Sequence, residues 1–357
     1  MTARDELETL TPEFGIYING SEVPIDTIAA DLISLDVFDD ADATSMFAIK
    51  LTAWDAVEVK VKWMDHKLFR EGNPVKIEMG YHNHLKTLFS GEITGLEPEF
   101  AEARPPTLTI RGYDRRHRLM HERKTRSFTN LKDSDIATKI AHEASLKPEA
   151  EDSKVVLPYV LQHNQTDLEF LLARARRIEY EVVVEDNSLL FRPRKIENSA
   201  TVKLRLNIEL LEFRPRMTTM GQVKEFTVRG WNPKKKKEIV ACSAAGDESS
   251  KMGGTTTGPA KVKGLFTSTG STRVTMPVQS QEEADQMAKR GFSEMALGYI
   301  KAEGVCIGDP SLRAGTVVKV EGIGERFSGL YYLCSTEHRF SMRKGYRTAF
   351  SALRNAT

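Results

Sequence analysis

The first third of the chain alternates apolar and polar residues with the period of two that is typical of β-strands. Residues 14–20 form a short alternating run that ends in an Asn-Gly turn, and residues 75–81 place Val, Ile and Met on one face. After a polar loop the chain returns over residues 87–94, which predicts a hairpin, and residues 107–113 alternate again. We therefore expect residues 1–120 to form an antiparallel barrel or sandwich.

From residue 121 the period changes to apolar positions three and four apart, which predicts helices. Residues 131–144 and 166–178 carry this pattern, and Thr166 with Glu169 resembles a capping box at the start of the second helix. Two short strands follow within 181–192. The interval 121–199 is thus predicted to be an α+β insertion of the size of a small domain.

Strand patterns resume over residues 200–242 and again over residues 305–357. Between them, residues 243–304 contain a stretch rich in Gly, Ser and Thr at 244–258, typical of a flexible surface loop, and a helical pattern at 281–299. The predicted order is a first β-barrel, an α+β insertion, and a second β-barrel that a loop and a helix interrupt.

Composition narrows the class of protein. The 357 residues are 40% hydrophobic and 28% charged, which is ordinary for a soluble globular protein of two or three domains. The formal net charge of +1 gives the protein no overall positive electrostatic field that would attract nucleic acid. The cysteines Cys242, Cys306 and Cys334 are odd in number and far apart, so they predict neither a disulfide framework nor a zinc site. The first residues mix both charge signs without an apolar core, so we expect no classical signal peptide, and no stretch approaches about 20 apolar residues.

Five short motifs could carry chemistry, and each has a plainer reading. The histidines of 82–84 fit a hairpin tip, those of 117–121 lack a third zinc ligand, and the lysines of 234–237 fit a solvated turn. The paired glycines of 304–308 and 322–326 do not open a helix after a strand, so we interpret them as turn glycines. We expect no catalytic, cofactor-binding or metal-binding residues, and hence a protein that is not an enzyme.

Glycines followed or preceded by aromatic residues recur at the ends of the predicted strands, in one order along the chain. These structural motif residues are Gly80, Tyr81, Gly91, Gly112, Tyr113, Asp114, Gly230, Trp231, Gly329, Gly345 and Tyr346. His338 stands between the last groups. Together they resemble the phage late control D family, which includes the VgrG-type baseplate hub proteins of contractile injection systems.

The resemblance implies a mainly β protein with an α+β insertion and two related tube-like antiparallel β-barrels, the second joining 200–242 with 305–357. It implies a structural baseplate hub, a homotrimer that acts as a symmetry adaptor between a hexameric inner tube protein and a trimeric spike. Other baseplate proteins are further expected partners. No cofactor, required nucleic-acid contact or stable membrane insertion is implied.

Because no spike region follows the hub pattern, we expect either a separate spike protein or a truncated chain. Assembly is expected in the bacterial cytoplasm, as a component of a phage virion or a phage-tail-like particle. Phage tails, bacteriocins and injection or secretion systems all fit the sequence. The alternatives from other classes are a tail-tip cell-wall hydrolase, which needs a catalytic group, and a carbohydrate-binding module, which favours exposed aromatic residues on one sheet face.

Overall fold

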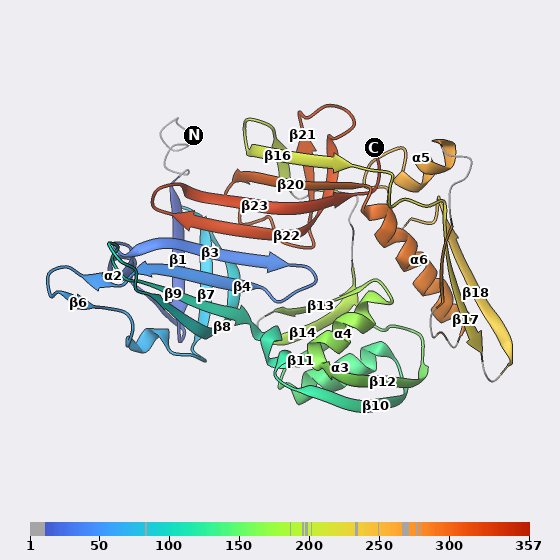
Figure 1. The fold of residues 1–357 in the computed structure, drawn as a ribbon, viewed down its shortest axis with the longest axis horizontal. Coiled ribbons are helices and arrows are strands. Elements are labelled where there is room, and N and C mark those ends of the chain that lie inside the picture. Colours follow the sequence, from blue (N-terminus) through green and yellow to red (C-terminus); the bar gives the residue numbers. More distant parts are fainter. Residues whose placement is uncertain are drawn as a thin grey trace. The chain divides into compact units, whose positions relative to one another are not determined.

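The computed structural model describes residues 11–357, except 83, 186, 195, 197–198, 201, 233–234, 249, 266–270, 276–277 and 279. The chain divides into two compact units. In Figure 1 the ribbon is coloured along the sequence, from blue at the N-terminus to red at the C-terminus. Unit 1 comprises Met1–His117, Val305–Ala314 and Ser335–Phe350; unit 2 comprises Arg118–Gly304, Gly315–Cys334 and Ser351–Thr357. Each unit therefore takes strands from the end of the chain.

Unit 1 is built on an antiparallel sheet. Its strands before residue 117 are β1 (Pro12–Ile18), β2 (Ser21–Glu22), β3 (Leu32–Asp40), β4 (Met46–Thr52), β7 (Pro74–Tyr81), β8 (His84–Glu99) and β9 (Thr107–Asp114). They pair in the order β2-β1-β7-β8-β9-β4-β3, and β5 (Trp54–Asp55) and β6 (Lys60–Val61) form a separate hairpin. Its short helices are α2 (Ile25–Ile28) and η1 (Lys67–Phe69), and η2 (Arg115–Met120) spans the boundary with unit 2.

The alternation in the sequence accounts for these strands. In β7, Val75, Ile77 and Met79 are buried on one face and join the core of unit 1. The predicted hairpin is confirmed, because β7 pairs antiparallel with β8. The predicted Asn-Gly turn is confirmed as well, since Asn19 and Gly20 have φ of 55° and 78° between β1 and β2.

The end of the chain completes the sheet of unit 1. The strands β20 (Ile300–Ile307), β22 (Gly329–Ser341) and β23 (Gly345–Arg354) contribute residues to both units. Within unit 1, Ser335–Phe340 of β22 pair antiparallel with Leu35–Asp40 of β3. The sheet therefore joins segments from opposite ends of the sequence.

The α+β insertion forms a compact part of unit 2 with its own core. It contains β10 (Arg123–Leu131), α3 (Asp133–Glu143), β11 (Lys147–Ala150), β12 (Leu157–Thr166), α4 (Asp167–Arg176), β13 (Tyr180–Glu185) and β14 (Ser188–Pro193). Both predicted helices are present. The capping box is confirmed: the Thr166 hydroxyl accepts from the Glu169 N–H at 3.1 Å, and the Glu169 carboxylate accepts from the Thr166 N–H at 3.0 Å.

The rest of unit 2 contains two further groups of strands. The first group adds β15 (Val202–Arg205), β16 (Leu210–Met217) and β21 (Val317–Glu321) to the strands named above. Its strand order is β16-β20-β23-β22-β21-β15. In the other, β17 (Glu225–Asn232) lies between β18 (Lys237–Ala244) and β19 (Ser271–Thr275). The helices are α5 (Gly258–Leu265) and α6 (Gln281–Leu297). The mainly antiparallel β class predicted from the sequence is confirmed.

The strand pairing differs in part from the predicted second barrel, which grouped residues 200–242 with 305–357. β15 and β16 pair with strands near the end of the chain, but β17 and β18 do not. Instead, β17 and β18 pair with each other and with β19. Their apolar face, with Val228, Ile239 and Ala241, is covered by α6. This hairpin thus finds its apolar cover in a helix and needs no strands from the end of the chain.

Residues 244–258 also differ from the predicted flexible loop, because the described part is anchored. Met252 is fully buried in a cluster with Val317 and Leu330, and the Ser250 carbonyl accepts a hydrogen bond from the Asn355 side chain. Burial of the Met252 side chain gives this segment a favourable free energy that its small polar residues do not provide.

The prediction that the paired glycines of 304–308 and 322–326 are turn glycines is confirmed only for the second pair. Gly322 and Gly324 both have φ of 82° and are turn glycines, as predicted. Gly304 is not a turn glycine, because it lies inside β20. Gly308 follows that strand, and a Cβ placed there would lie 2.2 Å from the ring of Tyr346. The smallness of Gly308 serves ring packing.

Candidate functional site

The glycine motif residues of unit 1 allow neighbouring strands to approach closely. A Cβ on Gly80 would lie 2.2 Å from the His84 carbonyl oxygen, and one on Gly112 would lie 2.1 Å from that of Glu92. A Cβ on Gly91 would meet the Tyr113 carbonyl oxygen at 2.3 Å. These glycines are therefore required by backbone packing between β7, β8 and β9.

The aromatic motif residues from the two ends of unit 1 meet. The rings of Tyr81 and Tyr346 lie 6.0 Å apart, and the Tyr81 hydroxyl donates to the Gly308 carbonyl at 2.9 Å. Gly345, which precedes Tyr346, has φ of 64°. Burial raises the pKa of Tyr81 to about 12, so this phenol stays protonated as a donor.

His338 is fully buried beside these tyrosines and its protonation can be assigned. One ring nitrogen, Nε2, lies 2.8 Å from the Leu312 carbonyl oxygen, which can only accept, so Nε2 carries the proton. Nδ1 then accepts from the Tyr346 hydroxyl at 2.8 Å and lies 3.2 Å from that of Thr348. Burial lowers the pKa of His338 to about 4, so the imidazole is neutral.

Asp114 belongs to a second polar cluster of unit 1. Its carboxylate accepts from the Ser45 N–H at 2.8 Å and pairs with buried Arg116 at 2.7 Å. The Ser45 hydroxyl donates to Asp39, and Arg313 pairs with the other Asp39 oxygen at 2.8 Å. Burial opposes ionisation of Asp39, but Arg313 and the hydrogen bonds outweigh it and lower the pKa of that carboxyl.

The remaining motif residues have separate positions. Tyr113 lies partly exposed at the end of β9. Gly230 lies inside β17 opposite Ile239, and the next residue, Trp231, is exposed. Gly329 starts β22 with φ of 143°, and a Cβ there would lie 2.4 Å from the Arg354 guanidinium. The structure therefore brings together the unit 1 motif residues and leaves Trp231 at a surface.

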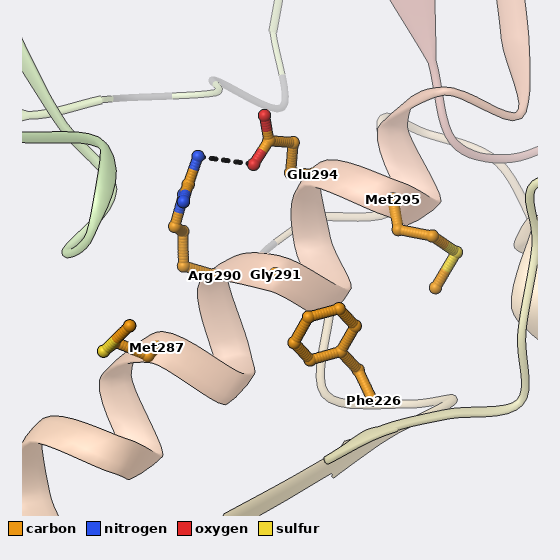
Figure 2. Close-up of a pocket in the computed structure, with 6 residues that line it drawn as sticks. All are labelled: Phe226, Met287, Arg290, Gly291, Glu294 and Met295. Carbon is orange, nitrogen blue, oxygen red and sulfur yellow. Dashed lines mark ion pairs between the residues drawn. The ribbon is translucent and has the colours of Figure 1, made fainter. Parts of the chain in front are cut away.

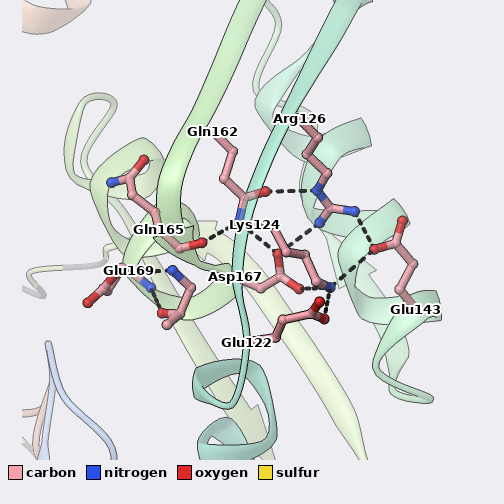
Figure 3. A network of polar contacts seen from close by, with 9 residues as sticks. Glu122, Lys124, Arg126, Glu143, Gln162, Gln165, Asp167 and Glu169 are labelled. Atoms are coloured by element: carbon pink, nitrogen blue, oxygen red, sulfur yellow. Dashed lines mark hydrogen bonds and ion pairs between the residues drawn. The ribbon is translucent and has the colours of Figure 1, made fainter.

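The insertion contains a dense polar network, drawn in Figure 3. The Asp167 carboxylate receives Lys124 at 2.7 Å and Arg126 at 2.8 Å, and Arg126 also pairs with Glu143 at 2.5 Å. The fully buried Gln162 accepts from Arg126 and donates to Asp167. These side chains come from β10, β12, α3 and α4, and each of them is paired with another member of the network. We therefore interpret the network as one that holds these elements together, and not as a catalytic site.

A groove of about 340 Å³ lies against α6 in unit 2, shown in Figure 2. It is lined by Phe226, Met287, Arg290, Gly291, Glu294 and Met295. Arg290 pairs with Glu294 at 2.5 Å, and burial together with nearby Arg176 and Arg194 lowers the pKa of its guanidinium. A Cβ on Gly291 would lie 2.5 Å from the Phe226 ring, which explains a glycine inside a helix.

The sequence candidates for chemistry lie apart. His82 pairs with Glu13 at 2.6 Å, while His84 starts β8. His117 lies 3.5 Å from Glu92 and 2.8 Å from the Asp114 carbonyl oxygen. Lys235, Lys236 and Lys237 are exposed after β17, and Lys234 lies outside the described residues. Among the described residues no group of three or more His, Cys, Asp and Glu could hold a metal.

Sequence reasoning missed the roles of His338 and of the Asp39 cluster. The signal for His338 was available, because Thr336, His338 and Phe340 alternate on the buried face of β22. Nothing local marks Asp39 and Arg313 as partners. No helix in the described part of the chain is long and apolar enough to cross a membrane.

The fold is shared with solved tail proteins. A 43 kDa tail protein of prophage MuSo2 from Shewanella oneidensis matches with a TM-score of 0.70 and 14% identity, covering 96% of this chain and 98% of that chain. A tail protein from Neisseria meningitidis MC58 matches with 0.70 and 12%, covering 96% and 97%.

A third similar structure is an E. coli type VI secretion system component, c3393, that exhibits structural similarity to T4 bacteriophage tail proteins gp27 and gp5. Its TM-score is 0.57 at 12% identity, covering 96% of this chain and 77% of that chain. The protein therefore has a fold found in phage tail and type VI secretion proteins.

A family model described as the Alg8 N-terminal domain matches residues 8–341, so the chain belongs to that family. That description names neither tails nor baseplates, so the likeness to tail proteins rests on the fold of the solved structures. No curated protein matches the chain.

Gly112→Ala should destabilise the protein by roughly 2 kcal/mol or more, because its Cβ would lie 2.1 Å from a backbone oxygen that cannot rotate away. The matched control is Gly95→Ala, where nothing lies within 4 Å, and there the change should stay within about 0.5 kcal/mol. Urea unfolding measures both. Equal losses would show that close strand approach is not what requires Gly112.

The buried His338 should make folding sensitive to acid. Its pKa falls from 6.5 to about 4 on folding, so the unfolded chain binds more protons between these values. The stability from neutral His338 is complete above about pH 6.5 and is lost as pH falls toward 4, by up to about 3 kcal/mol.

Unfolding by urea between about pH 7 and about pH 4.5 tests this expectation. His338→Gln keeps a donor and an acceptor but cannot titrate, so its stability should depend less steeply on pH than that of the wild type. His163→Gln, at an exposed position, should keep the wild-type slope. An unchanged slope in His338→Gln would argue against a neutral buried imidazole.

Proposed function

We propose that the chain is a structural hub subunit of a phage-tail-like baseplate, a homotrimer that joins a hexameric inner tube to a trimeric spike. The observation that carries the proposal is the likeness over 96% of the chain to two tail proteins, each at a TM-score of 0.70. The likeness to a type VI secretion component, itself similar to T4 tail proteins, adds to it.

The strand organisation offers a physical basis for adapting symmetry. Unit 1 contains one strand group, and a second group, β16-β20-β23-β22-β21-β15, lies largely in unit 2 and shares β20, β22 and β23 with unit 1. Three copies would supply six strand groups, so a true threefold ring could present six similar positions to a hexameric tube. Pro215 in the outermost strand β16 cannot donate to a ladder, so it limits uncontrolled edge pairing.

The proposed role is structural and not enzymatic. The thiol of Cys306 is buried, which raises its pKa to about 12 and prevents a reactive thiolate. The described residues that most resemble an acid–base pair are His117 and Glu92, whose side chains lie 3.5 Å apart. Arg115 also lies beside the Glu92 carboxylate. The proposed partners are the inner tube protein, a separate spike protein and other baseplate proteins, with assembly in the bacterial cytoplasm.

We expect the purified chain to form a trimer and to appear as threefold density at the end of the tube. Sedimentation at increasing concentration and electron microscopy of the particle measure this. A ring interface is heterologous, so it closes only with a fixed number of copies. One or six copies in the assembled particle would contradict the adaptor mechanism.

We expect no cell-wall hydrolase activity. The measurement is the turbidity of a cell-wall suspension with the pure protein, beside a lysozyme positive control. The strongest rival group for acid–base chemistry is the His117–Glu92 pair. Reproducible clearing that disappears in Glu92→Gln would establish an enzyme and reject the purely structural role.

A further inference from the structure

The groove on α6 follows one face of that helix. Its helical residues recur three and four positions apart and therefore share one stripe: Met287, Arg290, Gly291, Glu294 and Met295. From the first to the last, the stripe is about 12 Å long, because an α-helix rises about 1.5 Å per residue. That length matches about three or four residues of an extended peptide.

The floor of the groove is apolar and adaptable. The Phe226 ring from β17 packs against the helix at Gly291, and Met287 and Met295 lie on either side of this contact (Figure 2). Methionine side chains are flexible and polarisable, so they adjust to apolar groups of different shape. With about 340 Å³ the groove is near the lower limit of ligand pockets, which leaves room for a few side chains but not for a large cofactor.

The rim of the groove carries an excess of positive charge. Arg176, at the end of α4, and Arg194, after β14, act electrostatically on Arg290. Burial and these like charges lower the pKa of the Arg290 guanidinium, while Glu294 and Glu179 act in the opposite direction. Among these described groups, three cations thus face two carboxylates. A further carboxylate would relieve the repulsion between the guanidiniums.

Glu294 occupies the position that a ligand carboxylate would take. It pairs with Arg290 at 2.5 Å, but the Glu294 side chain is 64% exposed, whereas that of Arg290 is only 24% exposed. An ion pair with so exposed a partner is weak, so Glu294 can turn away at little cost. The planar guanidinium of Arg290 then offers two parallel N–H groups to an incoming carboxylate.

These features favour an acidic peptide over nucleic acid. Grooves for single-stranded nucleic acid combine a run of cations with several aromatic residues on which bases stack. Among the described residues that line this groove only Phe226 is aromatic, and Glu179 and Glu294 would repel phosphates. An extended peptide with alternating acidic and apolar residues would instead direct its apolar side chains to the floor and its carboxylates to the rim.

We propose that the α6 groove binds an extended peptide segment of a partner protein, in which carboxylates alternate with apolar side chains. Arg290 receives one carboxylate in place of Glu294, and Phe226 with the two methionines receives a neighbouring apolar side chain. The inference goes beyond the proposed hub role and does not depend on a trimer, because all residues of the groove belong to one chain.

Binding of two fluorescently labelled six-residue peptides to the purified full-length chain, measured by anisotropy, tests the inference. One peptide alternates Glu and Leu, and the other alternates Gln and Leu. We expect the Glu peptide to bind and the Gln peptide to bind at least about tenfold more weakly, because a neutral amide does not pair with the guanidinium as a carboxylate does. Equal binding of both peptides, or binding of neither, would overturn the inference.

The two members of the ion pair should change the affinity for the Glu peptide in opposite directions. Arg290→Gln removes the cation, so the affinity should fall at least about tenfold. Glu294→Gln removes the competing carboxylate, so the affinity should rise about twofold to fivefold. Because Glu294 is exposed, its variant decides the matter if Arg290→Gln folds poorly. A loss in Glu294→Gln, or no loss in a folded Arg290→Gln, would contradict the exchange of carboxylates.

The matched control is Arg229→Gln. Arg229 also pairs with a glutamate, Glu238 at 3.4 Å, but it lies on the face of β17 opposite that of Phe226. The control should bind the Glu peptide as the wild type does, and an equal loss would reduce the effect to overall charge and overturn the inference.

A single-stranded oligonucleotide added as competitor separates the two classes of ligand. We expect it to leave the Glu peptide bound, and displacement at a concentration similar to that of unlabelled peptide would assign the groove to nucleic acid and overturn the inference. A chain that is monomeric at every concentration but binds the Glu peptide would reject the proposed hub while supporting the role of the groove.

Discussion

The pairing of Ser335–Phe340 with Leu35–Asp40 is the constraint on which unit 1 depends. It joins residues about three hundred positions apart, as in the Arg339–Asp36 contact, which spans 303. The entropic cost of closing a loop grows only slowly with its length, so the apolar surface buried by such a pairing can offset that cost. It places Phe340 4.8 Å from Phe14. His338, in the same strand segment, finds its ring partners on the end of the chain itself, at Leu312 and Tyr346.

Buried polar clusters reinforce the same arrangement. In unit 1, Asp39 and Asp114 meet Arg313 and Arg116 through Ser45, so two segments far apart in sequence share one set of charges. In the insertion, Asp167 has the corresponding position between Lys124 and Arg126. Removing one partner of such a pair leaves an uncompensated buried charge, whereas slipped registers would separate the pairs. These clusters thus favour one register more than they add net stability.

The motif residues of unit 1 differ from Trp231 in their surroundings. Trp231 is exposed, while His338 and the glycines of β7, β8 and β9 are satisfied internally. The motif residues that define the hub resemblance therefore serve mostly to build unit 1. The fold is shared with a tail protein that is only 14% identical to this chain.

The sequence determined the local features: the turn at Asn19-Gly20, the β7–β8 hairpin and the capping box at Thr166, because period, turn residues and caps act within a few positions. It also indicated that Gly112 and Tyr346 mark the fold. Only the tertiary structure decided that Ser335–Phe340 pair with β3, that β17 and β18 pair with β19, and that Met252 is buried. Alternation fixes which face of a strand is apolar but not which strand lies beside it. The neutral state of His338 likewise follows from its burial in the folded unit.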